Sequence, residues 1–190
     1  MTYLKAIENI INEKYPQLVH AESFSIIESA PTAICKEAKF NYSTKIGDVI
    51  AYKFDERDPH GVPYILFPFF KQGTGTGLNA MCDGILFYQR KKKNQIYLIL
   101  CNLKSMNEGN NVVQIEAGEL FGRFLIDSAR RVDKSLSKPE IIVREAQFRP
   151  RVVSEEQPTK MNKHVPKRTY YFESSNRKID TANIRHICEE

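Results

Sequence analysis

Three polar side chains stand at the ends of the two apolar runs in residues 82–105, CDGILFYQRKKKNQIYLILCNLKS. Asp83 precedes the first run, and Asn102 and Lys104 end the second. The basic turn at 90–94 predicts a β-hairpin, and a turn centred between residues 92 and 93 pairs Asp83 directly with Asn102. Because strand side chains alternate between faces, Asn102 and Lys104 share a side. The spacing therefore predicts one polar patch, which a register slip of one residue would break.

Such a patch has the side chains that phosphodiester hydrolysis needs. A carboxylate beside an amide oxygen offers the hard ligands that Mg²⁺ prefers. A neighbouring lysine could orient or deprotonate an attacking water and stabilise the charge that develops on a phosphate. The alternative is structural: Asp83 with Gly84 forms a turn leading into a strand, and Asn102 and Lys104 are ordinary polar strand ends.

The helix expected over residues 110–131 follows this hairpin. Gln114 lies in its first turn at the edge of the apolar face, where it either reaches the polar patch or turns to solvent. Glu116 is about 100° from the centre of that face and could also reach the patch, whereas Glu119 points nearly opposite. The predicted apolar face consists of Val113, Ala117, Leu120, Phe121, Phe124 and Leu125.

The remaining elements suggest a mixture of helices and strands. Helices are expected over 2–14, with Thr2 as its cap, and over 181–188. Strands are expected over 46–54, 62–70, 140–148 and 169–174. The glycine-rich residues 71–80 are predicted to be a connection rather than a phosphate-binding loop, because a strand and not a helix follows them. Residues 150–168 are expected to form a long loop or arm, so the fold class is α/β (α+β) with a C-terminal extension.

Composition suggests one domain, residues 1–150, with a basic extension at 151–190. The hydrophobic fraction of 42% over 190 residues is enough for a core. No long apolar segment or signal peptide is present, so we expect a cytoplasmic protein without membrane association. The four cysteines lack metal-ligand spacing and are expected to be reduced and buried. The net charge of +5 arises entirely after residue 122, which favours an anionic partner such as nucleic acid.

The order of elements and the D-G and acid-x-Lys positions resemble those of the PD-(D/E)XK (restriction-endonuclease-like) nuclease superfamily. The resemblance implies an αβββαβ core with a mixed central sheet flanked by helices. It also implies that Asp83 binds metal, that Lys104 is catalytic, and that Gln114 is the glutamine found on the helix in many branches. Asn102 departs from the usual acid. Another carboxylate would then complete the metal shell, with Glu116 the geometric candidate and Glu8, Glu22, Glu28 and Glu37 left open.

The function that this resemblance implies is a metal-dependent nuclease acting on DNA. Mg²⁺, held by Asp83 and Asn102, would be its cofactor, with Mn²⁺ able to substitute, and Asp83, Asn102, Lys104 and Gln114 would be its catalytic residues. The basic extension would contact the phosphate backbone through Lys160, Lys163, Lys167 and Arg168. The alternative is a catalytically inactive module of the same fold that binds nucleic acid or a protein partner. A homodimer and an unrelated α/β enzyme also remain open.

Overall fold

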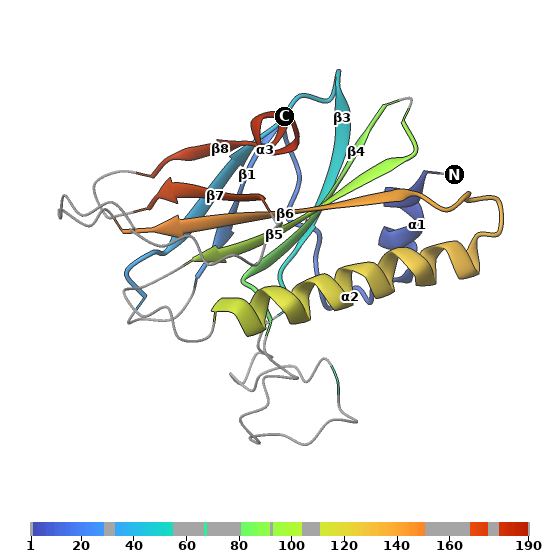
Figure 1. Ribbon diagram of the computed structural model, residues 1–190, viewed down its shortest axis with the longest axis horizontal. Helices are drawn as coiled ribbons and strands as arrows, with labels where there is room; N and C mark the ends of the chain where they lie inside the picture. Colours follow the sequence, from blue (N-terminus) through green and yellow to red (C-terminus); the bar gives the residue numbers. More distant parts are fainter. Residues whose placement is uncertain are drawn as a thin grey trace.

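The computed structural model describes residues 2–28, 33–54, 67, 81–91, 93–103, 111–150, 168–174 and 179–189 (Figure 1). Helices and strands alternate irregularly along these residues. In chain order they are α1 (Tyr3–Ile10), β1 (Ser23–Ile27), β2 (Glu37–Asn41), β3 (Gly47–Tyr52), β4 (Gly84–Arg90), β5 (Gln95–Leu103), α2 (Asn111–Val132), β6 (Glu140–Arg149), β7 (Arg168–Glu173), β8 (Thr181–Asn183) and α3 (Ile184–Cys188).

The described strands form two mixed sheets. The larger has the order β3-β4-β5-β6-β7, with antiparallel pairing from β3 to β5 and parallel pairing from β5 to β7. A parallel pair needs a crossover connection, and α2 makes it between β5 and β6. The smaller sheet, β1-β2-β8, joins antiparallel and parallel pairs. The protein is therefore a mixed α/β fold, and β7 and β8 incorporate the C-terminal region into both sheets.

Two hydrophobic clusters cover opposite faces of the larger sheet. On one face, α2 packs against alternate residues of β5 such as Leu98 and Leu100, and α1 packs against α2, β3 and β4. On the other, the smaller sheet and α3 pack against the intervening residues, including Ile99 and Cys101. Strand β5 is thus buried on both sides, which explains its continuous apolar sequence.

The predicted hairpin register is confirmed. Gly84 lies opposite Cys101 and Tyr88 opposite Tyr97, so the next pair at the open end is Asp83 with Asn102. The strand predicted over 140–148 is also confirmed, as β6, and it runs parallel to β5. The prediction for 46–54 corresponds to β3.

The predicted apolar face of α2 is wrong, although the helix itself is confirmed. Leu120 is 72% exposed, Phe124 is 62% exposed and Val113 is also exposed. Phe121 and Leu125 are buried as expected. Relative to the predicted face, the side of α2 that packs on the sheet is rotated by roughly 100° about the helix axis. The other buried residues on this side are Ile115, Gly118, Gly122, Ile126 and Ala129.

Two glycines cause this rotation. A Cβ atom at Gly122 would lie 2.6 Å from Leu98 Cδ1, and one at Gly118 would lie 2.6 Å from Cys82 Sγ. The helix backbone therefore approaches the sheet more closely than any side chain would allow. A pattern that counts only large apolar residues gives these glycines no weight, so it centres the face on the wrong side.

The ends of two predicted helices differ from the structure. Helix α1 is capped by Thr2 as predicted, since Thr2 Oγ1 accepts a hydrogen bond from Lys5 N at 3.3 Å, but it ends at Ile10 rather than near Lys14. The helix predicted over 181–188 begins only at Ile184, because Thr181–Asn183 pair with β2 as strand β8. Asn183 caps the shorter helix by accepting from Arg185 N at 2.9 Å.

Several predictions concern segments that the structure does not describe. Residues 71–80 and, apart from Phe67, residues 62–70 lie outside the described residues. So do residues 151–167 of the predicted arm, while the strand expected at 169–174 is β7. In the part of the chain that is described, no helix is both long and apolar enough to cross a membrane.

The prediction of free, buried cysteines is confirmed for all four: Cys35, Cys82, Cys101 and Cys188. Burial raises the pKa of the Cys188 thiol to about 12, and the nearby guanidinium groups of Arg144 and Arg90 offset only part of this effect. The thiolate is the reactive form of cysteine. Cys188 is therefore a packing residue in the native protein.

We expect Cys188 to resist alkylation in the folded state. At pH 8 a thiol of pKa about 12 is ionised to only about 10⁻⁴ and is sterically covered. Pulse labelling with iodoacetamide, read by peptide mass spectrometry, should leave Cys188 unmodified in buffer and fully modified in guanidinium chloride. Rapid labelling of Cys188 in native protein would contradict its burial.

The observed orientation of α2 predicts that a substitution on its buried side destabilises the fold much more than one on its exposed side. Gly122→Val should lower the free energy of unfolding by about 2 kcal/mol, because the new side chain overlaps Leu98. The matched control Leu120→Val, on the exposed side, should cost less than about 0.5 kcal/mol. Urea unfolding followed by circular dichroism measures both, and a larger cost at Leu120 would contradict the observed orientation.

Candidate active site at the carboxyl end of strand β5

Asp83 and Asn102 contact each other as the predicted register requires. Asp83 N donates to Asn102 Oδ1 at 3.4 Å, and Asp83 Oδ2 accepts a hydrogen bond from Leu103 N. Asp83 is half-buried, whereas Asn102 is completely buried. The carboxylate is therefore held against the end of β5 by the backbone of that strand, and the amide of Asn102 orients the segment that carries it.

Two further buried polar side chains lie on strand β6, which pairs with β5. Gln147 lies beside Asn102 in the β5–β6 pairing, and Glu145 lies beside Leu100. Gln147 Nε2 donates to Glu145 Oε1, and both residues are almost completely buried. Because parallel partners in register project to the same face, Asn102, Gln147 and Glu145 all lie on the α2 side of the sheet. We call Asp83, Asn102, Glu145 and Gln147 the polar row.

Side chains from β6 and β7 complete the hydrogen bonding of the polar row. Thr169 Oγ1 donates to Glu145 Oε2 at 3.1 Å. Arg149 Nε donates to Gln147 Oε1 at 2.9 Å, and the Arg149 guanidinium lies over the Tyr171 ring, 4.7 Å from its centroid. A buried carboxylate is costly unless it is hydrogen-bonded, and Glu145 uses both of its oxygens in these contacts.

Sequence reasoning did not single out Glu145 or Gln147, although β6 contains a signal. Glu145, Gln147 and Arg149 stand at alternate positions of β6, which pairs in parallel with β5. Central parallel strands are normally apolar on both faces. Three polar residues on one face of such a strand therefore indicate that this part of the sheet has a role other than hydrophobic packing.

The other predicted site residues on α2 differ in whether they lie toward the sheet. Gln114 is half-buried in the first turn of α2, and this end of the helix lies at the same end of the sheet as the carboxyl ends of β5, β6 and β7 (Figure 1). Glu116 is exposed on the side of α2 that faces away from the sheet, so the predicted approach of Glu116 to the patch is not observed. The rotation of α2 described above is the reason. Glu119 instead pairs with Arg123 at 2.9 Å.

Three of the other candidate acids make contacts elsewhere. Glu8 pairs with Lys5 at 2.7 Å, Glu22 accepts from Thr44, and Glu37 accepts from Ser25. Glu28 is half-buried at the end of β1. Lys104, Lys160, Lys163 and Lys167 lie outside the described residues, and of Arg168 only the backbone, which opens β7, is described.

The oxygen atoms at this site suit a hard divalent cation. Asp83 provides a carboxylate, and the amide oxygen of Asn102 lies 3.4 Å from the backbone nitrogen of Asp83. Mg²⁺ commonly uses one or two carboxylates and completes its shell with water and substrate phosphate. Among the described residues, no group of three or more His, Cys, Asp or Glu side chains gathers as a closed metal site. Asp83 and Asn102 are therefore residues that could contribute oxygen ligands to a Mg²⁺ ion with an otherwise open shell.

Comparison with known proteins gives no match for this chain. No protein-family model, no curated protein and no solved structure matches it. What the polar row can do has to be inferred from its side chains.

The contact between Asp83 and Leu103 predicts a difference between two substitutions of the same residue. Asp83→Ala should destabilise the fold by about 1–3 kcal/mol, because it leaves the buried Leu103 N–H without its acceptor. Asp83→Asn keeps an acceptor oxygen and should cost about 1 kcal/mol or less. Urea unfolding measures both free energies. Equal losses in the two variants would contradict a structural role for this hydrogen bond.

Proposed function

We propose that the protein is a Mg²⁺-dependent nuclease that hydrolyses phosphodiester bonds in DNA, with Asp83 as its metal-binding carboxylate. The observation that carries the proposal is the pairing of Asp83 with Asn102 at the carboxyl end of β5. Lys104 is the next residue but one after Asn102 in the sequence. An acid, an amide and a lysine thus stand within residues 83–104 of the sequence, and the first two meet at the end of one buried hairpin.

The order of elements in the larger sheet supports this proposal. Helix α1 precedes the antiparallel strands β3, β4 and β5, and α2 then leads to β6, parallel to β5. This is the αβββαβ order of the PD-(D/E)XK nucleases that the sequence resembles. Strands β1 and β2 are inserted between α1 and β3 and belong to the smaller sheet.

Several residues have a defined task in the proposed reaction. Asp83 would hold the cation, and Asn102 positions Asp83 by accepting a hydrogen bond from its backbone N–H. Mg²⁺ bound there would stabilise the negative charge that develops on the phosphate. Lys104 orients the attacking water, and Gln114 is a further polar group at this end of the sheet. The basic residues Lys160, Lys163, Lys167 and Arg168 would hold the DNA backbone.

A second candidate function follows from the neutrality of Asn102. The site then has one carboxylate where the family usually has two, which lowers its affinity for metal. The fold would in that case serve as an inactive module that binds nucleic acid or a protein. The complete burial of Asn102 favours this reading, because a buried amide is already used in packing. The two candidates differ in whether cleavage occurs.

Cleavage of DNA tests the first candidate. Wild-type protein should nick or cut plasmid DNA with Mg²⁺ or Mn²⁺, and excess chelator should abolish the activity. Asp83→Asn and Lys104→Ala should each lower the rate by about 10²-fold or more, while Lys93→Ala, an exposed residue of the hairpin turn, should not. Salt-sensitive DNA binding without cleavage by wild-type protein would favour the inactive module.

Thermal unfolding with Mn²⁺ tests the site without relying on activity. Bound metal stabilises the folded state, so the melting temperature of the wild type should rise with Mn²⁺, and that of Asp83→Asn should not. Asn102→Asp adds a carboxylate beside Asp83 and should melt lower without metal, through charge repulsion, but show a larger rise with Mn²⁺. The same Mn²⁺ response in wild type and Asp83→Asn would exclude Asp83 as a ligand.

A further inference from the structure

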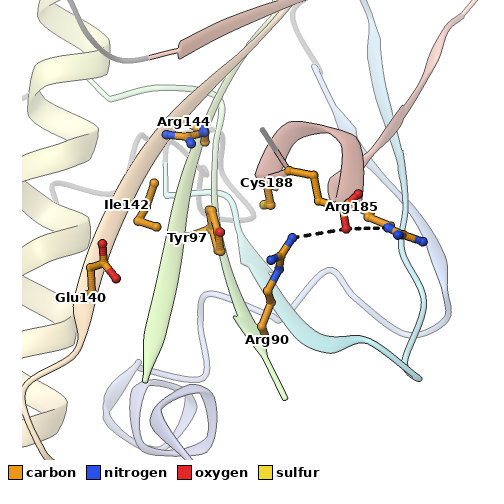
Figure 2. A pocket seen from close by; sticks show the side chains of 8 residues that line it. Arg90, Tyr97, Glu140, Ile142, Arg144, Arg185 and Cys188 are labelled. Atoms are coloured by element: carbon orange, nitrogen blue, oxygen red, sulfur yellow. Dashed lines mark hydrogen bonds and ion pairs between the residues drawn. The ribbon is translucent and has the colours of Figure 1, made fainter. Parts of the chain in front are cut away.

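A separate group of charged side chains lines a pocket on the face of the larger sheet opposite to α2 (Figure 2). The pocket has a volume of about 720 Å³. Arg90 comes from the end of β4, Arg144 from β6 and Arg185 from α3. Three guanidinium groups from segments far apart in the sequence therefore gather around one cavity, which we call the arginine pocket.

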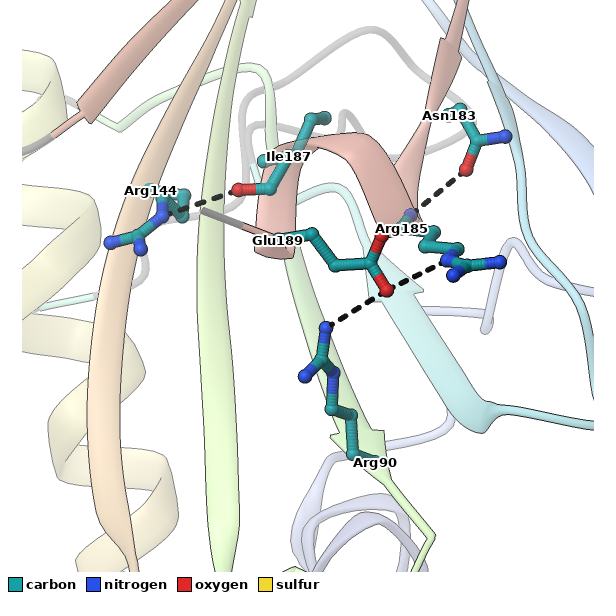
Figure 3. A network of polar contacts seen from close by, with 6 residues as sticks. All are labelled: Arg90, Arg144, Asn183, Arg185, Ile187 and Glu189. Carbon is teal, nitrogen blue, oxygen red and sulfur yellow. Dashed lines mark hydrogen bonds and ion pairs between the residues drawn. The ribbon is translucent and has the colours of Figure 1, made fainter.

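Tyr97 fixes two of these arginines. The Arg90 and Arg144 guanidinium carbons lie 5.6 and 5.9 Å from the centroid of its ring. Arg144 is also tied to α3, because its Nε donates to the Ile187 carbonyl oxygen at 3.2 Å (Figure 3). Cation–π contacts and hydrogen bonds of this kind hold a side chain in one orientation. The positive wall of the pocket is thus largely formed in advance of any ligand.

A carboxylate of the chain itself occupies part of this pocket. Glu189 Oε1 lies 2.7 Å from Arg185 Nε and 3.4 Å from Arg90 Nη2 (Figure 3). A carboxylate and a phosphate present similar oxygens to guanidinium groups. Glu189 thereby marks a position between Arg90 and Arg185 where an oxyanion fits.

The contacts of Glu189 leave the positive charge incompletely balanced. Among the residues that the structure describes, the lining contains three arginines and two acids, Glu140 and Glu189, and Glu140 already accepts a hydrogen bond from Gln95. Arg90 Nε is buried and has no hydrogen-bond partner among the residues that the structure describes. If Glu189 turns outward, the lining has a net charge of +2, which matches a phosphate dianion.

We propose that the arginine pocket binds a small organic phosphomonoester, with its phosphate between Arg90 and Arg185 in the position that Glu189 occupies. The volume is typical of a site for a small organic molecule, and larger than a lone phosphate needs. Ile142 and Cys188 supply an apolar wall for the organic part. Glu189 is then an internal competitor, which the phosphate displaces. This site is on the other face of the sheet from Asp83 and does not depend on the proposed nuclease activity.

Isothermal titration calorimetry at low salt, without divalent metal, tests the proposal. A nucleoside 5′-monophosphate should bind saturably at one site, inorganic phosphate should bind more weakly, and the uncharged nucleoside should not bind. An oligonucleotide with a 5′-phosphate, compared with the same oligonucleotide ending in a hydroxyl, distinguishes a polymer end from a free ligand as the source of the phosphate. Preference for the phosphorylated end would support the site with a polymer-borne ligand.

Two substitutions should change affinity in opposite directions. Arg185→Ala should weaken binding of the monophosphate about tenfold or more, because it removes a charge-assisted hydrogen bond. Glu189→Gln should strengthen it several-fold by removing the internal competitor. Both side chains are well exposed, 57% for Arg185 and 40% for Glu189, so both variants should fold. Lys91→Ala, an exposed cation next to Arg90, is the matched control and should bind like wild type.

The opposite changes in affinity expected for Arg185→Ala and Glu189→Gln distinguish a binding site from a purely structural ion-pair network. A structural network predicts that both variants are less stable and that neither changes binding. The proposal is overturned if neither wild type nor Glu189→Gln binds the monophosphate, if Glu189→Gln binds it more weakly than wild type, or if Lys91→Ala loses as much affinity as Arg185→Ala.

Discussion

The register of β4 against β5 is the constraint on which the rest of the molecule depends. Gly84 lies opposite Cys101 and Tyr88 opposite Tyr97, and both faces of the two strands are buried. A shift of one residue would exchange the two faces of a strand. Each hydrophobic cluster would then have to accommodate the side chains of the other. The packing of α2 on one face, and of α3 with the smaller sheet on the other, therefore fixes the register more strongly than the basic turn alone could.

Because side chains alternate along β5, the polar row and the arginine pocket lie on opposite faces of the larger sheet. Asn102 belongs to the α2 side, with Leu98 and Leu100, whereas Tyr97 belongs to the side covered by α3. The polar row lies near the carboxyl end of the strand and the arginine pocket near its beginning. The buried core between them is densely packed and changes shape little. The polar row and the arginine pocket therefore have no residue in common.

The sequence predicted those features that depend on local pattern and failed where distant packing decides. The hairpin and the pairing of Asp83 with Asn102 followed from two apolar runs around a turn. The face of α2 was predicted wrongly because Gly122 contributes no hydrophobicity yet permits the closest approach to the sheet, while Leu120 is apolar yet exposed. The arginine pocket was not predicted at all, since its three arginines come from three elements, β4, β6 and α3, whose proximity arises only when β6 and α3 join the fold.

The polar row is difficult to explain as a device for stability. Glu145 and Gln147 occupy the interior of a parallel strand, where apolar residues of similar size would pack without needing partners. Their hydrogen bonds to each other, and to Thr169 and Arg149, offset the cost of burial but give little net stabilisation. Proteins depart from the ordinary pattern of a buried sheet chiefly where function requires it. Glu145 and Gln147 extend the row from Asn102 and Asp83 into the sheet, which is the arrangement that the proposed chemistry at the end of β5 would need for support.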